Sequence, residues 1–324
     1  MPPQAVTSKV FSAKSGTMAA NRSASLVSEL SQSVEFREAM DWFRQERLWI
    51  NDQHLSLCRV PAATFLEAKR AAWMQERFTS LGWESRLDRA GNVIASRPNA
   101  AGRPTIAVTA HLDTVLAPRL PEEISVGLEG QFLGPGVSDN GAGLAALLAV
   151  AGAWNAVEPF AEAFDAAPFT PVLIANVGEE GEGNLSGMRY LCRSDAKGDI
   201  GRIPAGFLVL DGPGYEHITC RALASRRFEV SIEGPGGHSW SDHGTGNPVH
   251  ALGRTVTLFT DGIAELTPVS ALRSSYNFGL IQGGSSINSI PVGAWAKVDL
   301  RSEDRIRMNA MAALLQESLE RAVA

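Results

Sequence analysis

Hydrophobic residues in the first quarter of the chain recur at helical spacing. Two amphipathic stretches lie within residues 34–81, and the second follows Pro61, a residue that suits the start of a helix. The apolar positions are Phe36, Met40, Phe43 and Leu48 in the first stretch, and Phe65, Ala68, Ala72, Met74 and Phe78 in the second. The spacing therefore predicts helices across this region, with these side chains facing the protein core.

Short apolar runs then alternate with further helical patterns. Two short strands are predicted around a turn at Ala90-Gly91, followed by three β-rich runs that indicate fully buried strands. The predicted strands are 83–87, 92–96, 105–110, 171–177 and 205–210, and the predicted helices follow Asp139 and cover 186–193. Strands that alternate with helices predict an α/β fold with a largely parallel sheet flanked by helices.

The pattern changes after about residue 222. Residues 226–233 alternate between polar and apolar, as expected for a strand with one exposed face. Further strands are predicted at 276–282 and 294–301, with helices at 247–260 and 305–322. We therefore expect three regions, namely a flexible N-terminal extension (1–33), an α/β domain (34–222) and a smaller α+β domain (223–324).

Composition narrows the possible functions. The 324 residues include 44% hydrophobic side chains and carry a net charge of −6, so the chain is a globular protein for which nucleic acid is a poor partner. No apolar run reaches the length of a membrane span. The acid-poor leader is compatible with a transit peptide, although a flexible extension explains it as well. Three scattered cysteines favour a reducing compartment, here taken as the cytoplasm, and all three are expected to be buried.

The first candidate for chemistry is Asp139, within a glycine-rich loop that spans Gly134 to Gly143. The loop runs into an Ala/Leu-rich segment, so Asp139 is expected near the start of a helix, where the helix dipole favours an ionised carboxylate. Such a carboxylate can bridge two metal ions. It can equally cap the helix that follows.

Other candidates follow the predicted buried strands. His111-Leu-Asp113 places two side chains on one side of a strand end, where His111 can bind a metal and Asp113 can fix its tautomer. Glu179 and Glu180 repel each other unless a cation or a shared proton compensates, and one can ligate a metal while the other acts as a general base. Asp211 ends a third strand.

Each of these residues also has a purely structural explanation. His111 could be satisfied by a nearby carboxylate, the two glutamates could belong to a solvated acidic loop, and Asp211 could be a turn residue. Four separate strand-end or helix-start positions that all supply hard oxygen or nitrogen ligands nevertheless favour a two-metal site. Because the ligands include no cysteine, Zn²⁺, Co²⁺ or Mn²⁺ is expected rather than a structural zinc.

Four motifs, in this order and spacing, resemble those of the co-catalytic zinc metallopeptidase family M20. They are His111-Leu-Asp-Thr-Val, Gly136-Val-Ser-Asp-Asn-Gly-Ala-Gly143, Gly178-Glu-Glu-Gly-Glu-Gly183 and Gly236-Gly-His-Ser239. The family includes carboxypeptidase G, peptidase T, acetylornithine deacetylase, succinyl-diaminopimelate desuccinylase and aminoacylase. The resemblance implies a hydrolase that cleaves an amide bond near a free terminus of a small peptide or an N-acyl amino acid, with two Zn²⁺ ions and a smaller lid or dimerisation domain.

The resemblance also implies a role for each residue. His111 and Asp211 would bind one metal, Glu180 the other, and Asp139 would bridge them. Glu179 would be the general base, with Asp113 orienting His111. In the smaller domain, His238 would stabilise the oxyanion, often from the partner subunit of a homodimer, while Asn288 and Arg301 would hold a substrate carboxylate.

One feature departs from the family pattern. The family completes its second metal site with a histidine after the smaller domain, whereas here no histidine follows His250. We therefore expect the C-terminal part of the catalytic domain to be missing, or to be supplied by a partner. The alternative function is a truncated, non-catalytic metal- or peptide-binding relative. A nucleotide-binding domain is a further alternative, although the G-x-G-x-x-G fingerprint is absent.

Overall fold

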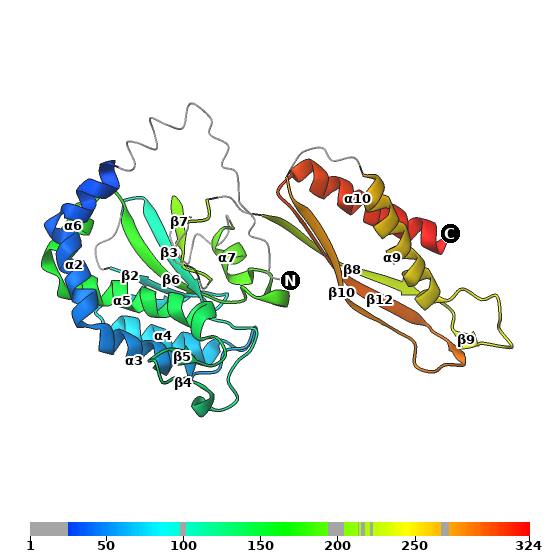
Figure 1. Cartoon of the computed structure of the whole chain (residues 1–324), viewed down its shortest axis with the longest axis horizontal. Coiled ribbons are helices and arrows are strands. Elements are labelled where there is room, and N and C mark those ends of the chain that lie inside the picture. The colour runs from blue at the N-terminus through cyan, green and yellow to red at the C-terminus, as the bar shows by residue number, and fades with distance from the viewer. Residues whose placement is uncertain are drawn as a thin grey trace. The chain divides into compact units, whose positions relative to one another are not determined.

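The computed structural model describes residues 25–97, 102–193, 204–212, 214, 218–220, 223–266 and 272–324. The chain divides into two compact units, Met1–Gly214 and Tyr215–Ala324, here called the larger and the smaller unit (Figure 1). Of the predicted flexible extension, residues 1–24 lie outside the described ranges, while residues 25–32 are helical.

A five-stranded mixed sheet forms the centre of the larger unit, in the order β1-β2-β6-β3-β7. The strands are β1 (Glu84–Leu87), β2 (Val93–Ser96), β3 (Thr105–His111), β6 (Thr170–Asn176) and β7 (Gly206–Val209). Strand β3 runs parallel to both β6 and β7, whereas the β1–β2 and β2–β6 pairs are antiparallel. The predicted α/β class is confirmed, and parallel pairing is confined to β6, β3 and β7.

Both faces of this sheet are covered, which explains the uninterrupted apolar runs in its central strands. All seven residues of β6 are buried. Leu173 and Ala175 pack into the core beneath the larger helical layer, while Val172 and Ile174 pack with Leu191 on the opposite face. The alternation follows from the two-residue repeat of a strand.

Helices form a layer on the face that carries the larger core (Figure 1). They are α2 (Val34–Gln45), α3 (Arg47–Cys58), α4 (Ala68–Ser80), α5 (Gly143–Ala156) and α6 (Glu158–Asp165), and α7 (Ser186–Leu191) lies on the other face. Helix α5 is apolar on nearly all sides because it contacts the sheet as well as α2, α3, α4 and α6. Within the described ranges, no single helix is long and apolar enough to cross a membrane. Helix α5 with its preceding turn reaches that length and apolarity only in combination with α6, and the two helices are bent by 98° relative to each other.

The second predicted amphipathic stretch begins later than its pattern indicates. Helix α4 starts at Ala68 rather than after Pro61, because the intervening segment is held as a loop: Ala63 pairs with Thr114, and the Thr114 amide donates to the Ala62 carbonyl. Phe65 is therefore exposed instead of facing the core. Two positions of the first stretch, Phe36 and Leu48, are also exposed, at 44% and 76%.

Short elements connect β3 to helix α5. A 3₁₀ turn (η1, Pro121–Glu123) precedes a small hairpin of β4 (Ser125–Val126) and β5 (Phe132–Leu133). A π-helical turn (η2, Val137–Ala142) follows and leads directly into α5; a kink in it gives Asp139 and Asn140 non-helical backbone angles. A second 3₁₀ turn (η3, Gly181–Gly183) follows the end of β6.

The smaller unit packs two antiparallel helices against one face of a three-stranded antiparallel sheet, ordered β10-β12-β8 (Figure 1). Its elements are β8 (Ala224–Glu233), α9 (Pro248–Glu265), β10 (Ser274–Gly283), β12 (Gly293–Ser302) and α10 (Arg305–Val323). Along β12, alternate residues are buried against the helices, from Ala294 to Ser302. A further two-stranded ribbon pairs β9 (Gly237–His238) with β11 (Ser289–Ile290).

The three cysteines occupy different environments, so the prediction that all are buried is wrong. Cys58 is buried, whereas Cys192 and Cys220 are exposed. Burial raises the pKa of the Cys58 thiol to about 11. Of the exposed cysteines, Cys192 follows α7 and Cys220 precedes β8.

We expect an aromatic disulfide reagent at about pH 8 to modify Cys192 and Cys220 readily in the native protein and Cys58 only after unfolding, because the thiolate is the reactive form. Absorbance at the reagent's product band measures this reaction. The Cys58→Ala variant should show the same fast phase and no additional reaction in denaturant. Equal rates for all three thiols in the native state would contradict this prediction.

Candidate metal centre

Three parallel strands deliver acidic residues and one histidine to the same edge of the sheet. His111 is the last residue of β3 and pairs with Asn176 at the end of β6. Glu179 and Glu180 follow β6 after a short turn, and Asp211 follows β7. Because the carboxyl ends of parallel strands share one edge, residues far apart in the sequence meet there.

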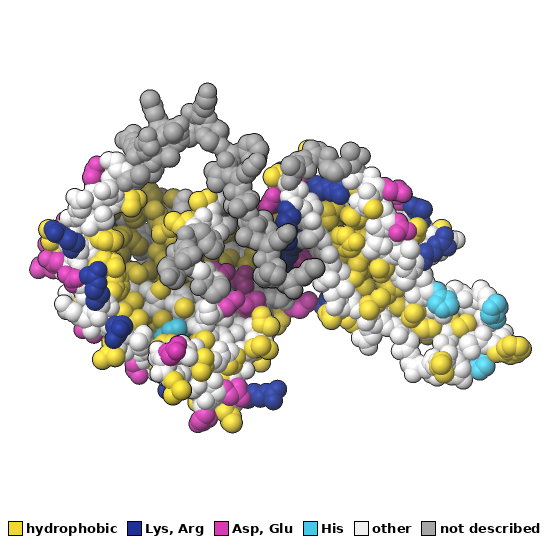
Figure 2. Space-filling view, viewed as in Figure 1, with side chains coloured by type: hydrophobic (Ala, Val, Ile, Leu, Met, Phe, Trp, Pro, Cys, Tyr) yellow, Lys and Arg dark blue, Asp and Glu magenta, His cyan; other side chains and the backbone are white. Residues whose placement is uncertain are grey.

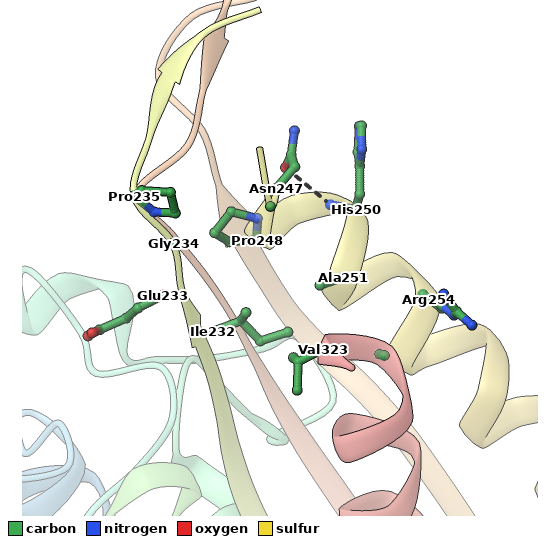
Figure 3. Close-up of a pocket in the computed structure, with 12 residues that line it drawn as sticks. Ile232, Glu233, Gly234, Pro235, Asn247, Pro248, His250, Ala251, Arg254 and Val323 are labelled. Carbon is green, nitrogen blue, oxygen red and sulfur yellow. Dashed lines mark hydrogen bonds between the residues drawn. The ribbon is translucent and has the colours of Figure 1, made fainter. Parts of the chain in front are cut away.

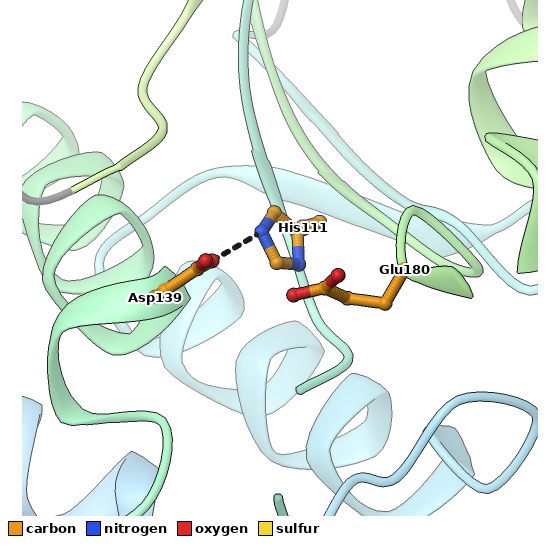
Figure 4. Close-up of side chains that lie close together, drawn as sticks. All are labelled: His111, Asp139 and Glu180. Atoms are coloured by element: carbon orange, nitrogen blue, oxygen red, sulfur yellow. Dashed lines mark hydrogen bonds and ion pairs between the residues drawn. The ribbon is translucent and has the colours of Figure 1, made fainter. Parts of the chain in front are cut away.

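His111 forms the centre of this group. The residue is 3% exposed, and its Nε2 lies 2.9 Å from Oδ1 of Asp139 and 3.4 Å from Oδ1 of Asp211. Potential ligand atoms of His111, Asp139 and Glu180 all lie within 4.8 Å of one another. Figure 4 shows the His111 ring between the carboxylates of Asp139 and Glu180. The structure therefore brings together four of the residues singled out in the sequence.

The other ring nitrogen of His111 faces the chain itself. Nδ1 lies 2.9 Å from the backbone carbonyl oxygen of Asp113 and 3.5 Å from its carboxylate. If Nδ1 carries the proton, it donates to the carbonyl and leaves Nε2 free to bind a metal. The carbonyl of Asp113, more than the carboxylate named in the sequence analysis, is thus placed to fix the ring.

The carboxylate of Asp113 is fully buried and accepts three hydrogen bonds of 3.0 Å. The donors are the backbone amides of Glu179 and Glu180 and the hydroxyl of Thr64. Asp113 therefore holds the turn that carries both glutamates against the end of β3. A second buried carboxylate, that of Glu67, accepts from the amide of Gly178 and holds the start of the same turn.

Asn140 anchors the loop that carries Asp139. Its side-chain amide donates to the carbonyl of Leu210 at 2.8 Å, and its Oδ1 accepts from the amide of Gly143 at 3.1 Å. The side chain thus joins the residue before Asp211 to the first turn of α5. The peptide bond between Asp139 and Asn140 is cis.

The carboxylates strongly favour positive charge on His111. Burial disfavours the imidazolium, but hydrogen bonds with Asp113 and Asp211, together with the charges of Asp211 and Glu179, outweigh that effect and raise the pKa of His111 to about 11. The hydrogen bond with His111 lowers the pKa of Asp211. Without a metal, this site therefore holds a proton where a cation could bind.

Both glutamates have elevated pKa values. Burial raises the pKa of Glu179, and the charges of Asp211, Glu180 and Asp113 add to the rise while His111 opposes it. Burial and the charge of Asp139 raise the pKa of Glu180. A carboxylate that binds protons more readily than usual in this position is suited to proton transfer.

The donor set fits a divalent metal. One imidazole nitrogen and several carboxylate oxygens converge, with no thiolate among them, which suits Zn²⁺, Co²⁺ or Mn²⁺. His111, Asp139 and Glu180 would hold the ion, and Asp211 lies beside the same histidine nitrogen. Acidic side chains lie among hydrophobic ones on the visible face of this unit in the space-filling view (Figure 2).

Two of the three site residues predicted in the smaller unit lie together. His238 pairs with Ser289 across the β9–β11 ribbon, and the amide of Ser239 donates to the carbonyl of Asn288. The His238 ring is held locally, since its Nδ1 accepts from the amide of Trp240 at 3.3 Å. Trp240 itself is 87% exposed.

Arg301 lies apart from that pair. It stands near the end of β12, whereas Asn288 precedes β11, which leads into the start of β12. Eight residues of strand separate Gly293 from Arg301, a span of about 26 Å at the usual rise. Arg301 donates to Asp299 at 2.7 Å. Arg301 is thus at the far end of β12 from Gly293, and the role of Asn288 and Arg301 in holding a substrate carboxylate stays a prediction.

A cavity of about 340 Å³ also opens in the smaller unit, between the end of β8, the start of α9 and the end of α10 (Figure 3). His250, Arg254 and Glu233 are among its lining residues. In the part of the chain that the structure describes, the one group of three or more metal-ligating side chains is in the larger unit. None of the candidate metal ligands lines this cavity.

Several residues that support the site were not predicted, namely Thr64, Glu67, His54 and Asn140. His54 lies 2.6 Å from the carbonyl of Val137, under the loop that carries Asp139. The partners of these side chains are far away in sequence, so periodicity gives no signal for them. Only Asn140 had a visible signal, because it follows Asp139 within the glycine-rich loop.

Comparison with known families supports two assignments. Residues 92–216 match the model of peptidase family M28, and residues 224–323 match the peptidase dimerisation domain of family M20. A search of curated proteins found no match.

Solved structures share the fold at low sequence identity. A tripeptidase from Staphylococcus aureus is 18% identical with a TM-score of 0.58, over 85% of this chain and 71% of that one. Aminopeptidase PepT from Bacillus cereus is 21% identical with a TM-score of 0.53, over 84% and 71%. The di-peptidase Dug1p from Saccharomyces cerevisiae is 14% identical with a TM-score of 0.63, over 89% and 76%.

The motif order, the histidine–carboxylate centre and the two family matches agree with one another. Residues 92–216 thus resemble a metallopeptidase catalytic domain of family M28, and residues 224–323 resemble the peptidase dimerisation domain of family M20.

Proposed function

We propose that the protein hydrolyses an amide bond near a free terminus of a small peptide or an N-acyl amino acid. The observation that carries the proposal is the convergence of His111, Asp139 and Glu180, with Asp211 beside the same histidine nitrogen. The names of similar structures, a tripeptidase, an aminopeptidase and a di-peptidase, support a peptide substrate.

In this proposal, His111, Asp211, Asp139 and Glu180 are the residues that would hold two divalent metals, Zn²⁺ by preference. When bound, the metals would polarise the amide carbonyl and make water more acidic. Glu179 removes a proton from the attacking water and then gives it to the leaving nitrogen. Its raised pKa suits both steps, because the group must accept and release a proton.

We further propose that two copies of the chain assemble through the smaller unit, and that His238 stabilises the oxyanion in the partner subunit's site. The match to a dimerisation domain supports assembly. Edge strand β10 carries no charged residue from Ser274 to Gly283 and exposes Leu280 and Ile281, whereas edge strand β8 carries Arg226, Arg227 and two glutamates. An uncharged edge pairs readily with another strand.

The Glu179→Gln variant should retain its metal content but lose turnover by about 10²–10⁴-fold, because the amide cannot accept the proton. Elemental analysis and hydrolysis of a set of dipeptides and N-acyl amino acids measure the two quantities. Near-normal turnover in this variant would remove Glu179 from the mechanism. Metal binding by the unmodified protein without any turnover would favour the non-catalytic alternative.

Metal affinity should rise with pH. Because the pKa of His111 is about 11 in the metal-free site, His111 must release a proton to bind, and the association constant should increase about tenfold per pH unit near neutrality. Titration calorimetry with Zn²⁺ at several pH values measures the slope. His111→Gln should abolish that slope, and Asp139→Ala should reduce the number of metals bound. A pH-independent affinity in the unmodified protein would refute proton displacement.

The Ile281→Lys variant should weaken self-association by about tenfold or more, because it places a charge on the β10 edge. Sedimentation velocity over a range of concentrations measures the change. Ser231→Lys adds the same charge to the β8 edge and serves as the matched control. If only the β8 variant dissociates, the interface has been assigned to the wrong edge.

A further inference from the structure

Four large apolar side chains are exposed on two short segments beside the candidate metal centre. Phe65 is 66% exposed, Leu66 71%, Val115 68% and Leu116 71%. These four residues are here called the apolar platform. Neither segment contributes these side chains to a core of the larger unit.

Backbone contacts fasten the two segments of the platform side by side. Ala63 and Thr114 form a parallel bridge, and the amide of Thr114 donates to the carbonyl of Ala62 at 3.0 Å. The buried guanidinium of Arg70 donates both to the carbonyl of Val60 and to that of Leu112, at 2.9 and 2.8 Å. The platform is therefore attached to a fixed part of the fold.

The same segments connect directly to the residues around the metal site. Thr64, the neighbour of Phe65, donates to the buried carboxylate of Asp113, which accepts from the amides of Glu179 and Glu180. Val115 follows Asp113 by two residues. The platform and the proposed general base are thus linked through one carboxylate.

Phe65 adopts an unusual backbone conformation. Its φ of 73° lies in the left-handed region, where a bulky side chain is strained and where glycine is favoured. Such strain together with an exposed aromatic ring does not stabilise the free protein. Strained residues of this kind cluster at ligand-binding sites.

The chemistry of the platform contrasts with that of the metal centre. Residues 60–66 and 112–118 contain one charged side chain, Asp113, and that side chain is buried. Any group that contacts the platform therefore meets apolar carbon rather than charge. An apolar surface beside a few convergent polar groups is the usual make-up of a small-molecule site.

We propose that the apolar platform binds the side chain of the substrate residue next to the scissile amide, so that amides of aromatic or branched aliphatic amino acids are preferred over those of glycine. This inference rests on the proposed hydrolase function. Leucine or phenylalanine at that position covers the platform, and the amide then lies at the residues that Asp113 holds in place.

The test uses the zinc-loaded Glu179→Gln variant, which binds substrate without consuming it. Titration calorimetry compares two dipeptide series, X-Gly and Gly-X, in which X is glycine, alanine, leucine or phenylalanine. In one of the series, we expect leucine or phenylalanine to bind about tenfold or more tightly than glycine. Adding Phe65→Ala or Val115→Ala should reduce this ratio at least severalfold while leaving the glycine peptide unaffected. Leu128→Ala, which changes a fully exposed leucine on the β4–β5 hairpin, is the matched control.

The Phe65→Gly change separates recognition from folding. Because glycine accepts the positive φ without strain, its Tm should equal or exceed that of the parent, while the preference for apolar peptides is lost. A lowered Tm with the preference intact would make Phe65 a structural residue and would overturn its role in binding.

The outcomes distinguish the platform from the proposed function. If apolar peptides bind selectively through the platform but the parent protein shows no turnover, the binding role of the platform is supported and the hydrolase function is refuted. Turnover without preference for X, or no peptide binding at all, refutes the platform. A change in sedimentation caused by Phe65→Ala, without peptide preference, would show that a second copy of the chain covers this surface and would likewise refute the proposal.

Discussion

The buried carboxylate of Asp113 is the constraint on which the metal centre depends. It has no solvent contact: burial raises its pKa, but the nearby His111 ring and the hydrogen bonds from the amides of Glu179 and Glu180 and from Thr64 outweigh burial and lower the pKa. Hydrogen bonds to a charged group contribute about 1.5–3 kcal/mol each. These bonds join the ends of two strands and the segment before α4 at one point.

The rest of the larger unit brings the groups that meet at Asp113 to one place. Parallel pairing of β6, β3 and β7 brings the segments that follow these three strands to one edge, and the fully buried central strand β6 supports this edge. Asn140 then secures the fourth segment by joining the loop of Asp139 to the residue before Asp211. Backbone amides hold the carboxylate of Asp113, and the carboxylates of Asp139 and Asp211 lie beside Nε2 of His111, so attraction to these groups counters the mutual repulsion of the carboxylates.

Much of the fold and the ligand set could be predicted because both depend on local patterns. Apolar runs marked strands β3, β6 and β7, although β7 is not fully buried as predicted, since Leu208 and Val209 are 59% and 62% exposed. The residues at or after the ends of these strands, His111, Glu180 and Asp211, meet because parallel strands end at one edge. The supporting contacts could not be predicted. Glu67 and the amide of Gly178 are 111 positions apart, and no periodicity relates them. The first residues after Pro61 looked helical, yet pairing with Thr114 overrides that preference.

The motif-based placement of Arg301 shows a second limit of sequence reasoning. Asn288 and Arg301 are close in sequence, but strand β12 lies between them and places Arg301 about 26 Å from Gly293, the first residue of the strand. Conversely, His238 and Asn288 are far apart in sequence and come together through a short ribbon. Whether two motif residues cooperate is thus decided by the secondary structure between them.

The metal centre has a buried side and a solvent-exposed side. The buried side stabilises the site, and the exposed side carries its chemistry. Towards the core, Asp113 is fully buried and Asn140 is 1% exposed, so that face is closed by satisfied hydrogen bonds. Towards solvent, the side chains of Asp139 and Asp211 are 52% and 40% exposed. The closed face fixes His111 and the two glutamates, while the open face presents carboxylate oxygens that the chain leaves without full neutralisation. A cation therefore reaches these carboxylates from their solvent-exposed side.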